Sequence, residues 1–245
     1  MPFPDHAFEL KGGCRCKAVR FKVSVPPFED RPLSPYKTPG LELPDSVQPR
    51  FPMSVLCHCN GCRAATAQIG VSGMSTHAPT VSVSVLGPKT GSDGSPAAPV
   101  SDDERTWTSW ASMRSKFSAD ETSPLKRYES SPSRWRYFCG VCGSPIGYEV
   151  DPTSLPAELN WPHVVMLWTG ALDRSILEKD WVRPDHIMFT SFGIPWVREQ
   201  AKNGVQGAQE HPFILVDQPM GKESIEKILP MVRGAGINDE ITIWE

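Results

Sequence analysis

The sequence predicts a mainly β fold in which many short strands are joined by long, irregular loops. Between the loops, apolar and polar residues alternate with a period of two, as they do in strands that bury one face. Prolines number 25 in 245 residues and gather in a few stretches, where they disfavour helices and paired strands. Because helix signals are few, strands are expected to form most of the regular structure.

Six segments carry strand signals. The clearest are residues 18–25, AVRFKVSV, and 80–86, TVSVSVL, in which apolar and polar residues alternate. Four shorter runs are rich in β-branched or aromatic residues, at 134–138, 145–150, 163–169 and 186–190. A short C-terminal helix is predicted over 222–233, where apolar residues share one helical face before a proline.

The chain is expected to form one domain over residues 1–245, with a core of about 10–200 and a C-terminal extension over 201–245. Loop insertions are predicted near residues 26–52, 87–133 and 150–162. Within the second insertion, two stretches are the most loop-like. Residues 87–104 are rich in Gly, Ser, Pro and Asp, and residues 118–133 are rich in serine and contain two prolines.

Composition narrows the class of protein. The net charge is −3 and the pI is about 6.1, which argues against a dedicated nucleic-acid binder. The N-terminus has no basic region followed by an apolar segment, and no apolar run reaches the ~18 residues of a membrane span. We therefore expect a soluble, cytoplasmic protein that acts on a small molecule, without a nucleic-acid or membrane partner, and a homo-oligomer is compatible with the sequence.

All seven cysteines fall in three tight groups. These are C-x-C, C-H-C-x-x-C and C-x-x-C, formed by Cys14 and Cys16, by Cys57, Cys59 and Cys62, and by Cys139 and Cys142. Thiols this close in sequence converge in space, as metal ligands do. The odd number of cysteines would leave one thiol over in a disulfide framework. Metal binding is therefore the favoured interpretation.

The two pairs and the triplet predict two different metal sites. Cys14, Cys16, Cys139 and Cys142 add up to a complete four-thiolate site that joins two ends of a sheet across ~120 residues. The triplet supplies three thiolates and leaves a fourth position for water, substrate or another side chain. Because closed zinc sites are structural and catalytic ones keep such a position, the triplet is the candidate catalytic centre.

Other arrangements are compatible with the sequence. All seven cysteines could be structural, with His58, His77 or another side chain completing the second site. The thiols could instead form disulfides or remain without metal, or the triplet could join the four-thiolate set. His58 is a candidate catalytic residue beside the metal rather than a ligand, whereas His163 and His186 have the positions of structural histidines.

Seven of the eight tryptophans are expected mainly to pack in the core or at its rim, and one or two of them to line the site. These seven are Trp107, Trp110, Trp135, Trp161, Trp168, Trp181 and Trp196.

The cysteines lie in three longer blocks, GCRCKAVRF at 13–21, CHCNGCR at 57–63 and FCGVCGSP at 138–145. A weaker fourth block combines GALD, RPDHI and PW within 170–196. Together these blocks resemble the glutathione-dependent formaldehyde-activating enzyme family, also called the centromere protein V family. The resemblance covers about 13–196, which is most of the chain.

The resemblance implies an Mss4-like β fold with two zinc ions. It implies a structural zinc on Cys14, Cys16, Cys139 and Cys142, and a catalytic zinc on Cys57, Cys59 and Cys62. The family reaction forms S-hydroxymethylglutathione from formaldehyde and glutathione. Two departures are Lys17, where the family has glycine, and the long insertions, which indicate a substrate bulkier than formaldehyde.

We accordingly expect a zinc-dependent enzyme of carbon–sulfur lyase type that acts on a glutathione or other thiol adduct, with glutathione as a candidate co-substrate. One alternative is a zinc-dependent lyase, dehydratase or hydrolase that acts on a bulkier metabolite without glutathione. Another is a non-catalytic, zinc-stabilised binding module.

Overall fold

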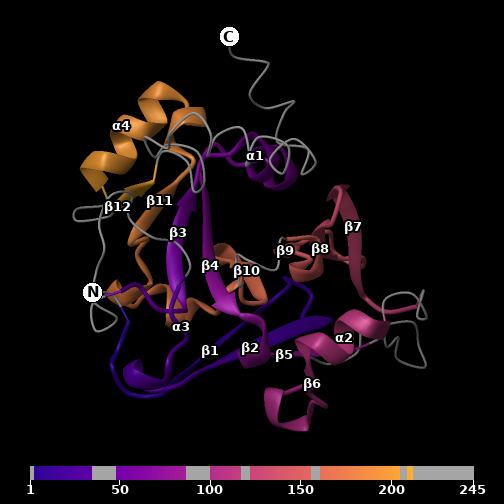
Figure 1. Ribbon diagram of the computed structural model, residues 1–245. Coiled ribbons are helices and arrows are strands. Elements are labelled where there is room, and N and C mark those ends of the chain that lie inside the picture. The colour runs from indigo at the N-terminus through magenta and orange to yellow at the C-terminus, as the bar shows by residue number, and fades with distance from the viewer. Residues whose placement is uncertain are drawn as a thin grey trace.

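A computed structural model describes residues 3–34, 48–86, 100–116, 122–155, 161–204 and 209–211. Within these residues the fold is mainly β, as the sequence predicts, with two sheets and four short α-helices (Figure 1). The predicted helix at 222–233 lies outside the described residues.

The smaller sheet is antiparallel and has the strand order β1-β2-β5-β6. Its strands are β1 (Phe8–Gly13), β2 (Val19–Val25), β5 (Val81–Val85) and β6 (Thr108–Ser109). In β2 the alternation predicts the buried face correctly, because Phe21 and Val23 are fully enclosed while Lys22 and Ser24 are not. The strand predictions at 18–25 and 80–86 are confirmed.

The larger sheet has the order β12-β11-β3-β4-β10-β9-β8-β7. Its strands are β3 (Met53–Cys57), β4 (Val71–His77), β7 (Leu125–Ser131), β8 (Arg134–Cys139), β9 (Pro145–Val150), β10 (Val164–Trp168), β11 (His186–Met188) and β12 (Gln209–His211). Strand β11 pairs in parallel with β3 and β12, and the other pairings are antiparallel. The four short strand predictions correspond to β8, β9, β10 and β11.

The two faces of the larger sheet have different surroundings. One face packs against the smaller sheet, so that Tyr137, Val165 and Leu167 share one buried cluster with Phe21 and Val23. Because side chains alternate along a strand, the neighbours of these residues point to the opposite face. There Met166 and Trp168 of β10 join a second cluster, which also contains Cys57 and Cys62.

Four α-helices connect the strands, α1 (Asn60–Thr66), α2 (Trp110–Lys116), α3 (Arg174–Leu177) and α4 (Pro195–Gly204). Helix α1 follows β3 after two residues. The thiol of Cys59 caps it by accepting a hydrogen bond from the Cys62 amide at 3.2 Å, and the helix ends at Ala67, which has a left-handed conformation. This capping brings the thiols of Cys59 and Cys62 onto one turn of the chain.

Strand β7 differs from the sequence prediction, because a loop was expected over 118–133. Only Leu125 of β7 is fully buried, and residues such as Tyr128 and Ser130 are exposed. The strand is defined by its pairing with β8 at the edge of the sheet, rather than by an apolar face of its own. Its polar composition therefore resembles a loop.

Among the described residues, no helix combines the length and the apolar character that crossing a membrane requires.

Candidate metal centres

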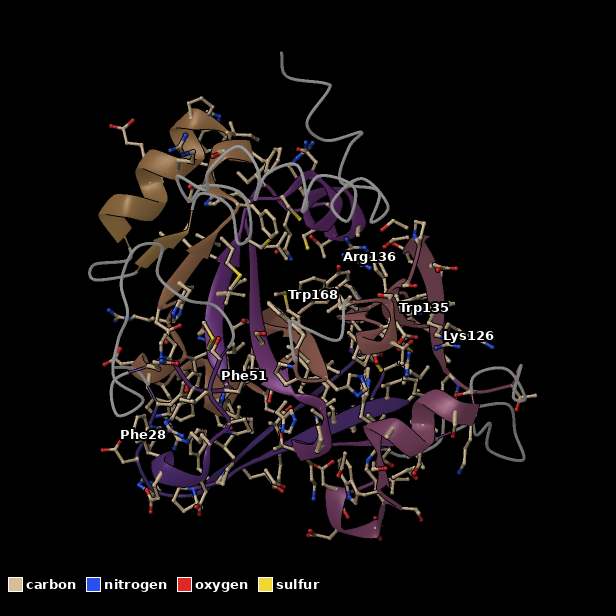
Figure 2. The ribbon with its side chains drawn as sticks, in the orientation of Figure 1. Phe28, Phe51, Lys126, Trp135, Arg136 and Trp168 are labelled. Carbon is tan, nitrogen blue, oxygen red and sulfur yellow. The ribbon has the colours of Figure 1, made fainter. Side chains whose placement is uncertain are left out.

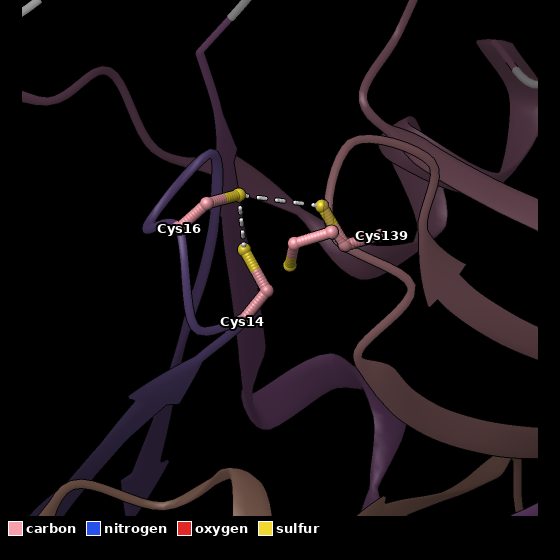
Figure 3. A group of neighbouring side chains, drawn as sticks. Cys14, Cys16 and Cys139 are labelled. Carbon is pink, nitrogen blue, oxygen red and sulfur yellow. Dashed lines mark hydrogen bonds between the residues drawn. The ribbon is translucent and has the colours of Figure 1, made fainter. Parts of the chain in front are cut away.

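The first centre brings together the two cysteine pairs. Cys14 follows β1 directly, Cys16 lies in the turn to β2, Cys139 ends β8, and Cys142 lies in the turn to β9. Their four Sγ atoms lie within 4.8 Å of one another. Cys16 Sγ lies 3.5 Å from Cys14 Sγ and 3.7 Å from Cys139 Sγ. Dashed lines mark both contacts in Figure 3.

These sulfur separations fit a metal ion. Four sulfurs at about 2.3 Å from a tetrahedral zinc are about 3.8 Å apart, whereas a disulfide bond is about 2.05 Å long. All seven cysteines are free thiols in the structure, which contradicts the disulfide alternative. The donor set at this centre therefore suits a thiophilic metal.

Backbone and hydroxyl groups point at the sulfurs of this centre. The amide of Val19 donates to Cys14 Sγ at 3.2 Å, and Ser144 Oγ lies 3.2 Å from Cys142 Sγ. Burial raises the pKa of Cys14. At Cys142, burial also raises the pKa, but hydrogen bonds from the Ser144 hydroxyl and from backbone amides outweigh it and lower the pKa to about 6. These bonds favour the thiolate, which is the form that binds metal.

The first centre joins two sheets rather than two ends of one sheet, which corrects the sequence prediction. Cys14 and Cys16 lie in the turn of the β1–β2 hairpin of the smaller sheet, and Cys139 and Cys142 belong to the β8–β9 hairpin of the larger one. The sequence shows two hairpins, but it does not show that they lie in separate layers. A metal ion held by these four thiols would therefore connect the two layers.

Two unusual backbone conformations shape the loops of this centre. Gly143 has φ +73°, a conformation that favours glycine, and it lies in the knuckle between Cys139 and β9. Lys17 has φ 60° although it is not glycine. Arg105 donates to the Lys17 carbonyl at 2.7 Å and the Lys17 amide donates to Cys14. These bonds hold Lys17 in its left-handed conformation.

The second centre is formed over six consecutive residues. Cys57 ends β3, Cys59 caps α1, and Cys62 lies in its first turn. Their Sγ atoms lie within 4.8 Å of one another, and Cys57 and Cys62 are buried. Among the described residues, no fourth histidine, cysteine or carboxylate joins this group. The two centres therefore differ by one protein ligand, as the cysteine spacing predicts.

Arg136 is the residue of the second centre that the sequence analysis missed. It projects from β8, it is 8% exposed, and its Nη1 donates to Cys62 Sγ at 3.7 Å. Its guanidinium also lies over the ring of Tyr148, 4.8 Å from the centroid. Within the described chain, no carboxylate pairs with Arg136. Its counter-charge is therefore supplied by the cysteines.

The arginine changes the electrostatics of the three thiols. Hydrogen bonds from Cys57 and Cys59 lower the pKa of Cys62 well below its ordinary value, and the charge of Arg136 lowers it further. Conversely, hydrogen bonding to the other two thiols and burial raise the pKa of Cys57. One thiolate is therefore favoured at Cys62 by the residues alone, and a metal would bind the triplet as thiolates.

The contact between Arg136 and Cys62 shows that the larger sheet is curved. In the sheet, β4, β10 and β9 separate β3 from β8. In a flat sheet these four strand spacings would amount to about 19 Å, at about 4.8 Å each. Because Cys62 lies only a few residues beyond β3, the face that carries it must be concave for Arg136 to reach it.

Large side chains cover the concave face between the thiols and the arginine. Met166 and Trp168 of β10 are buried in the same cluster as Cys57 and Cys62, and Tyr148 packs against this cluster. Figure 2 shows Arg136 and Trp168 in the region below α1. Gly73 of β4 makes room for them, since a Cβ there would lie 2.8 Å from Met166 Cγ. The described residues of this cluster are thus apolar or aromatic, and Arg136 lies beside them.

The histidines take positions outside both groups of thiols. His58 is buried between two cysteines in sequence, but its ring nitrogens do not join the triplet, and its ring lies near Gly70. His77 ends β4, and burial lowers its pKa. His186 Nδ1 lies 2.8 Å from Asp185 Oδ1. Within the described chain, neither His58 nor His77 completes the second centre.

His163 belongs to a separate buried network around Glu149. The Glu149 carboxylate is fully buried and is bonded to His163 Nε2, to the Tyr137 hydroxyl and to Trp110 Nε1, the last at 3.1 Å. Arg114 of α2 adds an ion pair at 3.1 Å. This network ties α2 to β8, to β9 and to the residue that precedes β10, on the face opposite the second centre.

Fold and sites together define a mainly β protein with two cysteine groups that could hold metal ions. No protein-family model matches the chain, and no curated protein is similar to it in sequence. Among solved structures, the chain is similar to the crystal structure of a Rhodobacter sphaeroides protein, at 13% identity and a TM-score of 0.30. That match covers 69% of this chain and 95% of the other.

Proposed function

We propose that the chain is a zinc-dependent enzyme of carbon–sulfur lyase type that acts on a thiol adduct at Cys57, Cys59 and Cys62. One observation carries this proposal. The three thiols converge without a fourth ligand among the described residues, whereas the other four cysteines form a complete set. A site with three protein ligands leaves one position for substrate, as catalytic zinc sites do.

Zinc is the metal we propose for both groups. Thiolates are soft ligands, and a tetrahedral four-sulfur set is typical of zinc or iron–sulfur sites. The Sγ–Sγ distances of 3.5 and 3.7 Å at the first centre agree with the edge of a zinc tetrahedron, about 3.8 Å. We assign the structural role to that centre, because it joins the two sheets.

Each residue of the second centre would have a separate role in the reaction. Zinc, when bound, supplies a Lewis acid that attracts a thiol, carbonyl or hydroxyl group. Cys57, Cys59 and Cys62 hold it, and Arg136 balances the negative charge that three thiolates place on a divalent ion. Trp168 and Met166 exclude water from the adjoining face. The resemblance of the cysteine blocks to the formaldehyde-activating family supports a thiol adduct as substrate.

The test is Cys59→Ser. Serine also caps helices well, so α1 should still form, while the triplet loses one metal ligand. We expect this variant to bind one zinc instead of two, to keep the circular dichroism spectrum of the wild type, and to lose turnover of formaldehyde with glutathione. Thr66→Ser, on the same helix, serves as the control and should behave as the wild type.

Three outcomes separate the alternatives. Full turnover by Cys59→Ser would exclude catalysis at the triplet. Wild-type turnover of bulkier substrates without glutathione would favour the glutathione-independent lyase, dehydratase or hydrolase. Absence of turnover on either kind of substrate, with two zinc ions bound, would favour the zinc-stabilised binding module.

A further inference from the structure

Arg136 is a buried cation beside the second centre. It is 8% exposed, and a buried guanidinium needs a counter-charge. Its neighbours are Cys62 Sγ at 3.7 Å and the ring of Tyr148, and no described carboxylate pairs with it. Its charge is therefore directed at the second centre.

The charge of the centre depends on this arginine. A divalent metal with three thiolates has a net charge of −1, and the guanidinium brings the total to zero. A fourth, anionic ligand would change the total charge to −1 with Arg136 and to −2 without it. Charges a few ångströms apart interact strongly where they are shielded from water, so this difference is large.

Arg136 also keeps hydrogen-bonding capacity for a ligand. A guanidinium has five N–H donors, and only Nη1 is used, toward Cys62. Nε and Nη2 have no partner in the described part of the chain. Their N–H groups can therefore donate to a further sulfur or oxygen at the centre.

We propose that Arg136 is the specificity-determining residue of the second centre and selects an anionic sulfur, a thiolate, over a neutral ligand for the fourth metal position. The inference rests on the proposed function, because it requires a metal held by the triplet. It adds a chemical reason why a thiol adduct, rather than a neutral carbonyl compound alone, would be the substrate. A merely structural arginine would stabilise the fold without changing this preference.

The test uses full-length protein loaded with cobalt(II), whose visible absorption reports its ligands. The protein is titrated at one pH with 2-mercaptoethanol, as a thiolate donor, and with imidazole, as a neutral donor. In Arg136→Met we expect the apparent affinity for the thiol to fall about tenfold to hundredfold, as for other residues that support metal ligands. The affinity for imidazole should stay the same or rise.

Two variants make the result specific. Arg134→Met removes the same charge from the same strand and face, two residues away, and should leave both affinities unchanged. Arg136→Lys restores the charge without the planar fork and should recover part of the thiol affinity. This variant also serves if Arg136→Met does not fold.

The outcomes distinguish this inference from the proposed function. An unchanged ratio of thiol to imidazole affinity in both Arg136 variants would overturn the inference. A wild-type protein that takes up cobalt only at the four-cysteine centre would instead overturn the proposed function. Parallel loss of both affinities would show that Arg136 supports metal binding without selecting its ligand, which also overturns the inference.

Discussion

Arg136 Nη1 lies 3.7 Å from Cys62 Sγ, and this contact joins residues that are 74 positions apart. It links a buried cation on β8 to thiols at the end of β3, across three intervening strands. Each group reduces the cost of burying the other, because an isolated charge in an apolar environment is strongly destabilising. The second centre is thus formed by tertiary structure as well as by a local sequence motif.

The first prediction concerns the metal ion that we propose for the first centre. Cys139→Ser removes a ligand of the first centre, whose halves are 123 residues apart. Structural zinc contributes roughly 10–16 kcal/mol in small peptides, and part of this should be lost. We expect the free energy of unfolding in urea, followed by circular dichroism, to fall by several kcal/mol. Cys59→Ser is the comparison, and its free energy of unfolding should fall much less.

A second prediction concerns retention of that metal. Ser144→Ala removes the hydroxyl that lies 3.2 Å from Cys142 Sγ. The pKa of Cys142, about 6 with this bond, should rise, so protons should compete better with the metal. We expect zinc release, measured with a chromophoric chelator, to occur at higher pH than in the wild type. Ser112→Ala, an exposed site on α2, should leave the release profile unchanged.

The Glu149 network yields a prediction about pH. Burial raises the pKa of Glu149, but hydrogen bonds from His163, Tyr137 and Trp110 outweigh it, so the pKa is lower in the folded than in the unfolded protein. Its stabilising contribution is therefore present above its ordinary pKa of 4.5 and is lost as the pH falls through the folded value.

Glu149→Gln should lower the free energy of unfolding by about 3 kcal/mol at pH 7. The difference from the wild type should shrink as the pH falls below about 4.5. Glu178→Gln, which changes an exposed carboxylate on the surface, should match the wild type at every pH. A constant difference across the acid range would contradict the assignment to the Glu149 charge.

Lys17 provides a prediction of increased stability. Its left-handed backbone, φ 60°, costs a side-chain-bearing residue roughly 1–2 kcal/mol, whereas glycine adopts it readily. Replacing Lys17 by glycine removes this cost, but part of the gain in stability is offset, since glycine loses more conformational freedom on folding. We expect Lys17→Gly to raise the free energy of unfolding by about 1 kcal/mol. Lys17→Ala keeps the strain and should show no gain.

The sequence was sufficient for the parts of the structure that depend on local pattern. Alternation defined β2 and β5, because each has one largely buried apolar face. Cysteine spacing predicted both groups of thiols, since metal ligands that lie close in sequence can converge without knowledge of the fold. For the two strands and the triplet the signal lies within a few residues, and the four-cysteine group was predicted by adding two such local pairs.

Features that depend on the arrangement of strands were missed. Strand β7 is polar because it forms the edge of the sheet, so its composition resembles a loop. Arg136 was missed because its approach to Cys62 requires a curved sheet, which no local pattern encodes. The connection of two separate layers by the first centre was missed for the same reason.

The cysteines of the second centre lie close together in sequence, whereas those of the first centre lie far apart, and this difference has a consequence for biosynthesis. Cys57, Cys59 and Cys62 are complete once a short segment has left the ribosome, whereas Cys14 and Cys16 must wait for Cys139 and Cys142. During that interval the early thiols can share one ion in a non-native combination. In refolding, thiols of different groups can likewise share an ion before the four-cysteine site has formed, so more native protein is expected when zinc is added after the chain has collapsed than when it is present from the start.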